Sequence, residues 1–155
     1  MRRAVLVAAI LLTACGAKEK SSTIAGTTYT TDERAGTASI TTANGSIKTI
    51  QGAAAAAVAM PTYAPLYPGA MVEGVMETDS GGRKIKMVTL ATRDPVGKVA
   101  GFYKAALTKE GWKLPQSLSM PDGALISGEK GGRRVSLAIS QQDGKTGIAL
   151  SVPND

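Results

Sequence analysis

The chain has 155 residues, with 18 Lys and Arg against 12 Asp and Glu, a formal net charge of +6, one cysteine and no histidine. The missing histidine excludes His-assisted serine or cysteine catalysis and leaves no imidazole ligand for zinc. The positive charge is mild and scattered, which argues for solubility and against a nucleic-acid-binding protein. We therefore expect no enzymatic activity, no cofactor and no metal site.

The first 14 residues have the three parts of an export signal. Two arginines follow the initial methionine, an apolar run covers residues 4–12, and the small residues Thr13 and Ala14 come next. A basic start, an apolar stretch and a small-residue cleavage point are typical of signal peptides. The apolar run is far shorter than the roughly 20 residues needed to span a bilayer as a helix. We therefore predict that residues 1–14 are a removable leader.

The end of this leader, Leu12-Thr13-Ala14-Cys15, resembles the lipobox of bacterial lipoproteins. The resemblance implies that the thiol of Cys15 is acylated, that the signal is cut just before it, and that the new amine is usually acylated as well. Because position 16 is Gly and not Asp, it also implies the outer rather than the inner membrane in a Gram-negative cell. The alternative is an ordinary signal peptide with a free thiol, which is unusual in an exported protein.

Residues 15–60 have the composition of a tether. The stretch 23–52 is rich in Thr, Ser, Ala and Gly and has few large apolar residues, which favours a flexible linker. Asn44-Gly45 interrupts this pattern, because it lies between two alternating β-branched runs and so indicates a hairpin over residues 38–50. A lone hairpin is marginally stable in water, so we expect it to be ordered only when docked on the domain or on a partner.

Residues 61–155 predict a small α+β domain with the element order β-β-α-β-β-β-β. It begins with an extended segment in which Tyr63 and Tyr67 either pack on the domain as a lid or form a surface for a partner. Alternating apolar residues and turn sequences then predict strands over residues 71–78, 83–92, 112–119, 124–129, 133–141 and 146–152. One amphipathic helix on one face of a mostly antiparallel sheet is the economical arrangement.

The predicted helix is expected to be capped by Asp94 and to end at Gly111. Away from its apolar stripe lie Gly97, Gly101 and Ala105. Small residues at this spacing allow another backbone to approach closely. This face is therefore either ordinary solvent-exposed surface or a contact for the N-terminal hairpin or a second molecule.

Two of the predicted strands begin alike, with a Gly-Gly turn followed by two basic residues, at residues 81–84 and 131–134. Tracing the chain up and down places both turns at the same end of the sheet, provided that residues 112–119 form a strand. The expected rim is Arg83, Lys84, Lys130, Arg133 and Arg134. It is either two ordinary hairpins with soluble strand ends, or a binding site for phosphate groups of membrane lipid or lipopolysaccharide, or for an acidic partner.

The sequence from Tyr63 onward resembles a group of small, uncharacterised exported bacterial proteins. The resemblance rests on Pro65-Leu66-Tyr67-Pro68-Gly69-Ala70, Asp94-Pro95, Phe102-Tyr103, Gly111-Trp112 and the final hairpins. It implies a fold but no activity. We predict an envelope lipoprotein, held in the membrane by acyl chains on Cys15, with a small binding or accessory domain that contacts envelope proteins or anionic lipid head groups. The alternative is a structural or surface-coating lipoprotein without a dedicated ligand.

Overall fold

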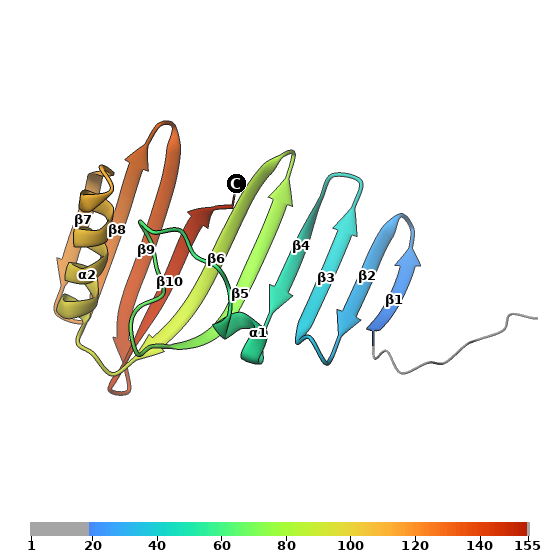
Figure 1. Ribbon diagram of the computed structural model, residues 1–155, viewed down its shortest axis with the longest axis horizontal. Helices are drawn as coiled ribbons and strands as arrows, with labels where there is room; N and C mark the ends of the chain where they lie inside the picture. The colour runs from blue at the N-terminus through green and yellow to red at the C-terminus, as the bar shows by residue number, and fades with distance from the viewer. Residues whose placement is uncertain (1–18, 155) are drawn as a thin grey trace, which may run out of the picture.

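The computed structural model describes residues 19–154, which form one antiparallel sheet of ten strands with two helices on it (Figure 1). The strands lie side by side in the order β1-β2-β3-β4-β5-β6-β10-β9-β8-β7. In chain order the elements are β1 (Glu19–Ile24), β2 (Thr27–Asp32), β3 (Thr37–Thr42), β4 (Gly45–Ile50), α1 (Gly52–Ala56), β5 (Met71–Ser80), β6 (Arg83–Thr92), α2 (Val96–Lys109), β7 (Lys113–Met120), β8 (Gly123–Lys130), β9 (Arg133–Gln142) and β10 (Lys145–Pro153). The predicted leader and Cys15 lie outside the described residues.

The predicted fold class is wrong in its strand pattern. We expected six strands and one helix behind a tether, whereas residues 19–50 form four further strands that continue the same sheet. β4 pairs with β5 from Gly45 opposite Ser80 to Ile50 opposite Val75, so the sheet crosses the expected boundary at residue 60 without a break. The structure is therefore a mostly antiparallel β-sheet with a small helix, instead of an α+β domain on a flexible linker.

The hairpin at Asn44-Gly45 is part of this extension. β3 and β4 pair from Thr37 opposite Ile50 to Thr42 opposite Gly45, and Ala43 and Asn44 form the two-residue loop. Gly45 opens β4 with a φ of 153°, and a Cβ atom there would lie only 2.1 Å from the carbonyl oxygen of Asp79. Glycine is needed at this position because the backbones of β4 and β5 approach too closely for a side chain.

The hydrophobic core lies on one face of the sheet, beneath α2 and the segment of residues 57–70 that crosses the strands (Figure 1). Alternate residues of the strands point into it, as Ile148, Leu150 and Val152 do on β10. Val99, Tyr103 and Leu107 of α2 cover them, and all three are fully buried. We call the opposite side of the sheet the open face.

The two ends of α2 are held differently from what the sequence suggests. Asp94 does not cap the helix, because the N-cap residue is Pro95 and no side chain caps it. At the other end the prediction of Gly111 is confirmed. Its φ is 74°, and the amides of Gly111 and Trp112 donate to the carbonyl oxygens of Thr108 and Leu107 at 3.0 and 2.9 Å. This is the Schellman arrangement, which satisfies the last carbonyl groups of the helix.

Asp94 instead joins three parts of the chain. The hydroxyl of Tyr67 donates to Asp94 Oδ2 at 2.7 Å, and Lys98 Nζ lies 2.9 Å from the same oxygen. The buried hydroxyl of Thr146 donates to the backbone carbonyl of Asp94 at 2.7 Å. The hydrogen bonds from Tyr67 and Lys98 lower the pKa of Asp94, whereas burial, and then the bond to Asp94, raise the pKa of Tyr67 to about 12. The cluster fixes the start of α2 to β10 and to the crossing segment.

Gly128 of β8 is closely surrounded by core side chains, and its replacement by alanine is expected to destabilise the protein. A Cβ atom there would lie 2.7 Å from Val135 Cγ1 and within 3.6 Å of Trp112 and Leu107. Overpacking of this kind costs about 1–3 kcal/mol of unfolding free energy. Urea unfolding followed by circular dichroism measures the loss.

Gly101→Ala is the matched control for Gly128→Ala. Nothing lies within 4 Å of a Cβ at Gly101, and this position is in the middle of the exposed side of α2. The substitution should therefore stabilise the protein by about 0.5–1 kcal/mol, because alanine is the better helix former. A Gly128→Ala variant as stable as the parent chain would contradict the close packing described above.

Candidate functional site

Two glycine turns set the positions of the basic rim. Gly81 and Gly82 connect β5 to β6, and Gly131 and Gly132 connect β8 to β9, with all four φ angles between 57° and 81°. Two consecutive positive φ angles are typical of the tight two-residue hairpin turn, which glycine adopts without strain. Each turn is followed at once by two basic residues at the start of a strand, at positions 83–84 and 133–134.

β10 lies between the two hairpins and ends before their turns, so it leaves a notch at this end of the sheet. Its ladder with β6 ends at Pro153 opposite Ile85, and its ladder with β9 ends at Ser151 opposite Ser136. Figure 1 shows the tip of β10, beside the label C, below the turns of both flanking hairpins. The space between them is an open cavity of about 980 Å³.

The notch is strongly basic. The charged residues that line it are Arg83, Lys84, Lys113, Lys130, Arg133, Arg134 and Glu129. Among residues 19–154, the notch therefore has six cationic side chains and one carboxylate. The rest of the lining is neutral and comes mainly from the glycine turns and from the end of β10. This arrangement favours an anion, because the cations surround one concave space instead of being spread over the surface.

The cations differ in how they are held. Arg134 forms a two-pronged contact with Glu129, with Nη2 and Nε at 2.6 and 3.1 Å from Oε1. Lys130 Nζ donates to the carbonyl oxygen of Glu110 at 2.5 Å, and the guanidinium of Arg133 lies over the ring of Trp112 at 5.9 Å. Within residues 19–154, Arg83 forms no ion pair. A ligand would thus meet three cations that contacts within the protein already orient, namely Lys130, Arg133 and Arg134.

All five residues of the predicted rim line this one notch. The prediction from the sequence did not include Lys113, the first residue of β7. It also did not include the depth of the site, which arises because β10 ends before the neighbouring turns. Lys113 could have been added from its place directly after the helix, beside the expected turn. The length of β10 relative to its neighbours has no sequence signal.

The other predicted surfaces have different surroundings. Gly97, Gly101 and Ala105 are exposed on α2, and the N-terminal hairpins do not lie there, because they pair at the edge of β5. Tyr63 and Tyr67 pack on the domain: the ring of Tyr63 lies 4.5 Å from that of Trp112, and Tyr67 is buried. Of the two interpretations of the tyrosines, packing as a lid is the one observed.

The core contains one polar group of special interest. The hydroxyl of Tyr103 is buried and has no hydrogen-bond partner of acceptable geometry. A backbone group of Tyr67 approaches it and partly offsets the main effect, in which burial raises the pKa of Tyr103 well above its ordinary value. Tyr103 lines neither the notch nor the smaller cavity beside β2 to β4.

Two further properties concern residues 19–154. This part of the chain has no cluster of three Cys, Asp or Glu residues that could hold a metal ion. It also has no helix that combines the length and hydrophobicity needed to cross a membrane.

Comparison with known proteins gives one family match. A family model described as START domain-like matches residues 72–145, from the second residue of β5 to the first of β10 and slightly less than half of the chain. No curated protein and no solved structure matches the chain. The match includes every basic residue of the notch and omits β1 to β4. The central part of the chain is therefore similar to START domain-like proteins.

Proposed function

We propose that the protein is a lipid-anchored binding protein of the bacterial cell envelope and that the notch binds phosphate groups of anionic membrane lipids. The observation that carries this proposal is the convergence of six basic side chains on one concave space with a single acidic residue. Arginine favours phosphate because its planar fork can donate two hydrogen bonds at once. A purely structural coat would need no such site.

The predicted anchor supports a membrane ligand. Cys15 precedes the start of β1 at Glu19 by four residues, which reach at most about 14 Å when fully extended. The tether is therefore far shorter than the 46 residues between positions 15 and 60 that the sequence suggested. With β1 held near the bilayer, head groups are the anions most concentrated around the protein.

The similarity to START domain-like proteins supports a binding role over a catalytic one, because such domains generally bind ligands. The lack of histidine points the same way. The proposal does not need an enzyme, a cofactor or a metal ion.

Charge reversal in the notch tests the proposal. The variant Arg83→Glu, Arg133→Glu, Arg134→Glu should lose at least about tenfold in affinity for vesicles containing phosphatidylglycerol, because each phosphate contact between charged groups contributes roughly 1.5–3 kcal/mol. Co-sedimentation with vesicles that contain phosphatidylglycerol is the measurement, and vesicles of phosphatidylcholine alone give the baseline. Binding should also weaken as salt rises.

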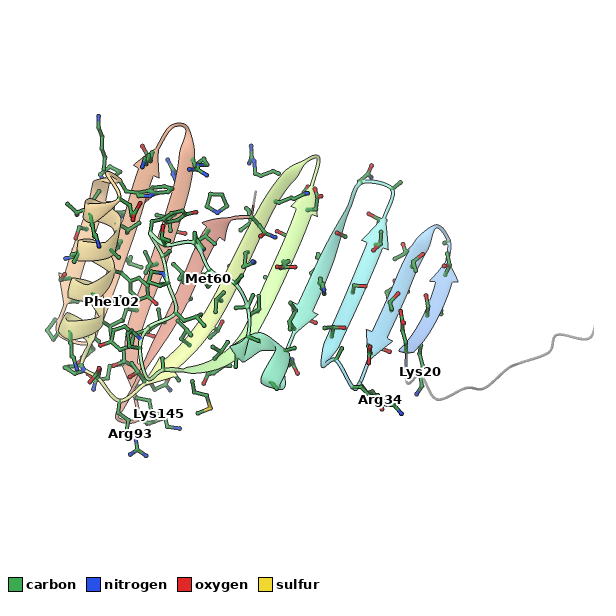
Figure 2. All side chains as sticks on the ribbon, viewed as in Figure 1. Lys20, Arg34, Met60, Arg93, Phe102 and Lys145 are labelled. Carbon is green, nitrogen blue, oxygen red and sulfur yellow. The ribbon has the colours of Figure 1, made fainter. Side chains whose placement is uncertain are left out.

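A matched control separates the site from net charge. Arg34, Arg93 and Lys145 lie at the opposite end of the strands (Figure 2), and their reversal to Glu changes the net charge by the same amount. The proposal requires that this control binds vesicles much better than the notch variant. If the control and the notch variant lose vesicle binding equally, a specific site is contradicted. If the parent chain binds a soluble acidic protein tightly but does not bind vesicles, the ligand of the notch is an acidic partner and not a lipid phosphate. Mass analysis of the native protein, with acyl chains expected on Cys15, tests the anchor separately.

A further inference from the structure

The open face of the sheet carries all the large apolar side chains that are exposed among residues 19–154. They are Ile24, Tyr29, Ile40, Ile47, Met71, Met87, Leu118, Met120 and Leu125, each between 37% and 66% exposed. A soluble monomer exposes single apolar residues at scattered places, whereas a concentration on one face indicates an interaction surface.

The strand register places these residues on that face and beside one another. Tyr29, Ile40 and Ile47 stand directly opposite each other on β2, β3 and β4. The row continues through Thr78 to Ile85 on β6, while Val88 and Leu90 of the same strand point into the core. At the other edge of the sheet Leu118 lies opposite Leu125. Apolar positions therefore run from β2 to β7 across the whole face.

The middle of the open face is also uncharged. Between the apolar residues lie small or hydroxyl-bearing ones, namely Thr49, Thr78, Thr89, Ser136, Ala138, Ala149 and Ser151. The charged residues that register assigns to this face are Lys20, Arg83, Lys113, Glu129, Arg134 and Lys145, and each lies on an edge strand or within two residues of a strand end. A membrane surface would instead favour basic residues spread across the docking face.

The size of the face fits a dimer. Ten strands about 4.8 Å apart make a surface roughly 48 Å wide, and strands of about eight residues make it roughly 27 Å long. That area exceeds the roughly 800 Å² per partner that a stable interface buries. Sheets stack about 10 Å apart with interdigitating side chains, which suits a flat face of Thr, Ser, Ala, Ile and Met. Contact with an identical copy carries no charge repulsion here, because the centre is neutral.

We propose that the open face binds the open face of a second copy of this chain, forming a two-layer β-sandwich dimer. The proposal rests on the apolar residues of the open face and not on the cations of the notch, two of which, Arg83 and Arg134, lie at one end of that face. In the dimer, each sheet has α2 on its outer side and the partner sheet on its inner side. The exposed apolar residues of β2 to β8 are then buried in a second core.

Sedimentation velocity on the chain from residue 15 onward, with Cys15→Ser to remove acylation, tests this proposal. We expect a dimer at tens of micromolar. Ile47→Lys and Met87→Lys each place a charge in the neutral centre of the face, and each should raise the dimer dissociation constant at least about tenfold. Thermal unfolding followed by circular dichroism shows whether the variants remain folded.

Ala105→Lys on the exposed side of α2 adds the same charge away from the open face and should leave the dimer intact. A parent chain that stays monomeric at about 100 μM would overturn the proposal. So would a dimer that Ala105→Lys dissociates and the two sheet variants do not, because that result would place the contact on the helix. A monomer whose vesicle binding is lost in Ile47→Lys and Met87→Lys would overturn it in favour of a lipid surface.

Discussion

Replacing Trp112 by alanine is expected to lower the free energy of unfolding by about 3–5 kcal/mol, the usual cost of deleting a large buried aromatic side chain. Trp112 is the only tryptophan of the chain and is 4% exposed. Its ring packs against Tyr63 of the crossing segment, and its amide closes the end of α2 on the carbonyl of Leu107. The alanine variant keeps the amide, but loss of the ring loosens the crossing segment and β8, which the ring contacts.

Urea unfolding followed by far-ultraviolet circular dichroism is the appropriate measurement, because the variant has no tryptophan fluorescence. Trp112→Phe is the control and should cost clearly less, since it keeps an aromatic ring against Tyr63. Trp112→Ala should also weaken vesicle binding, because Arg133 loses the ring over which it lies. An alanine variant as stable as the phenylalanine variant would contradict the role of the ring in the core.

The second large effect concerns Tyr67, where alanine should again cost about 3–5 kcal/mol through lost aromatic packing. The ring of Tyr67 lies 5.1 Å from that of Phe102 and 6.3 Å from that of Tyr103. Tyr67→Phe keeps this packing and removes only the hydrogen bond to Asp94. The difference between the two variants, measured by urea unfolding at pH 7, separates packing from the hydrogen bond.

Tyr67→Phe should also change how stability depends on pH. The pKa of Tyr67 rises from 10.0 to about 12 on folding. Between these values the unfolded chain releases a proton that the folded chain keeps, so stability is complete below pH 10 and falls as the pH rises toward 12. The phenylalanine variant should lose less stability over this range than the parent chain.

Burial of Tyr103 also raises its pKa, so Tyr67→Phe should still lose some stability at alkaline pH. The double variant with Tyr103→Phe should lose less stability at alkaline pH than Tyr67→Phe alone. At acid pH the dependence has the opposite sign. The pKa of Asp94 is lowered in the folded chain, so its contribution is present above pH 3.8 and is lost as the pH falls below that value. Identical alkaline unfolding profiles for all the tyrosine variants would contradict the assigned burial.

The four N-terminal strands show what the sequence does not reveal. Every residue of β1 is exposed, so no alternation of buried and exposed residues marks the strand. Backbone pairing and hydroxyl contacts hold it instead, such as Thr23 with Thr28 at 2.9 Å. The composition of residues 19–50 therefore resembles that of a linker, although these residues form regular β-strands. Only the hairpin at Asn44-Gly45 was predictable, because its turn and the close approach of Gly45 to β5 require particular residues.

The site was more predictable than the fold around it. The Gly-Gly turns fix where the hairpins reverse, and the parity of the strands between them brings Arg83 and Arg133 to the same end. Asp94 shows the limit of such local reasoning. Its carboxylate suits a helix cap, but Tyr67 is 27 residues away in the chain and reaches it in the folded protein. Long-range competition for a side chain has no local signature.

The strand order has a consequence for how the protein is made. Apart from one contact, each strand pairs with a neighbour in the sequence, and the exception is β10 against β6. Thr146 must find Thr92, and Pro153 must find Ile85, more than 50 residues earlier. The first six strands can pair with one another while the chain is still leaving the ribosome. The helical part can join them only after residues 145–153 have emerged, so we expect this late ladder to be the slow step of folding.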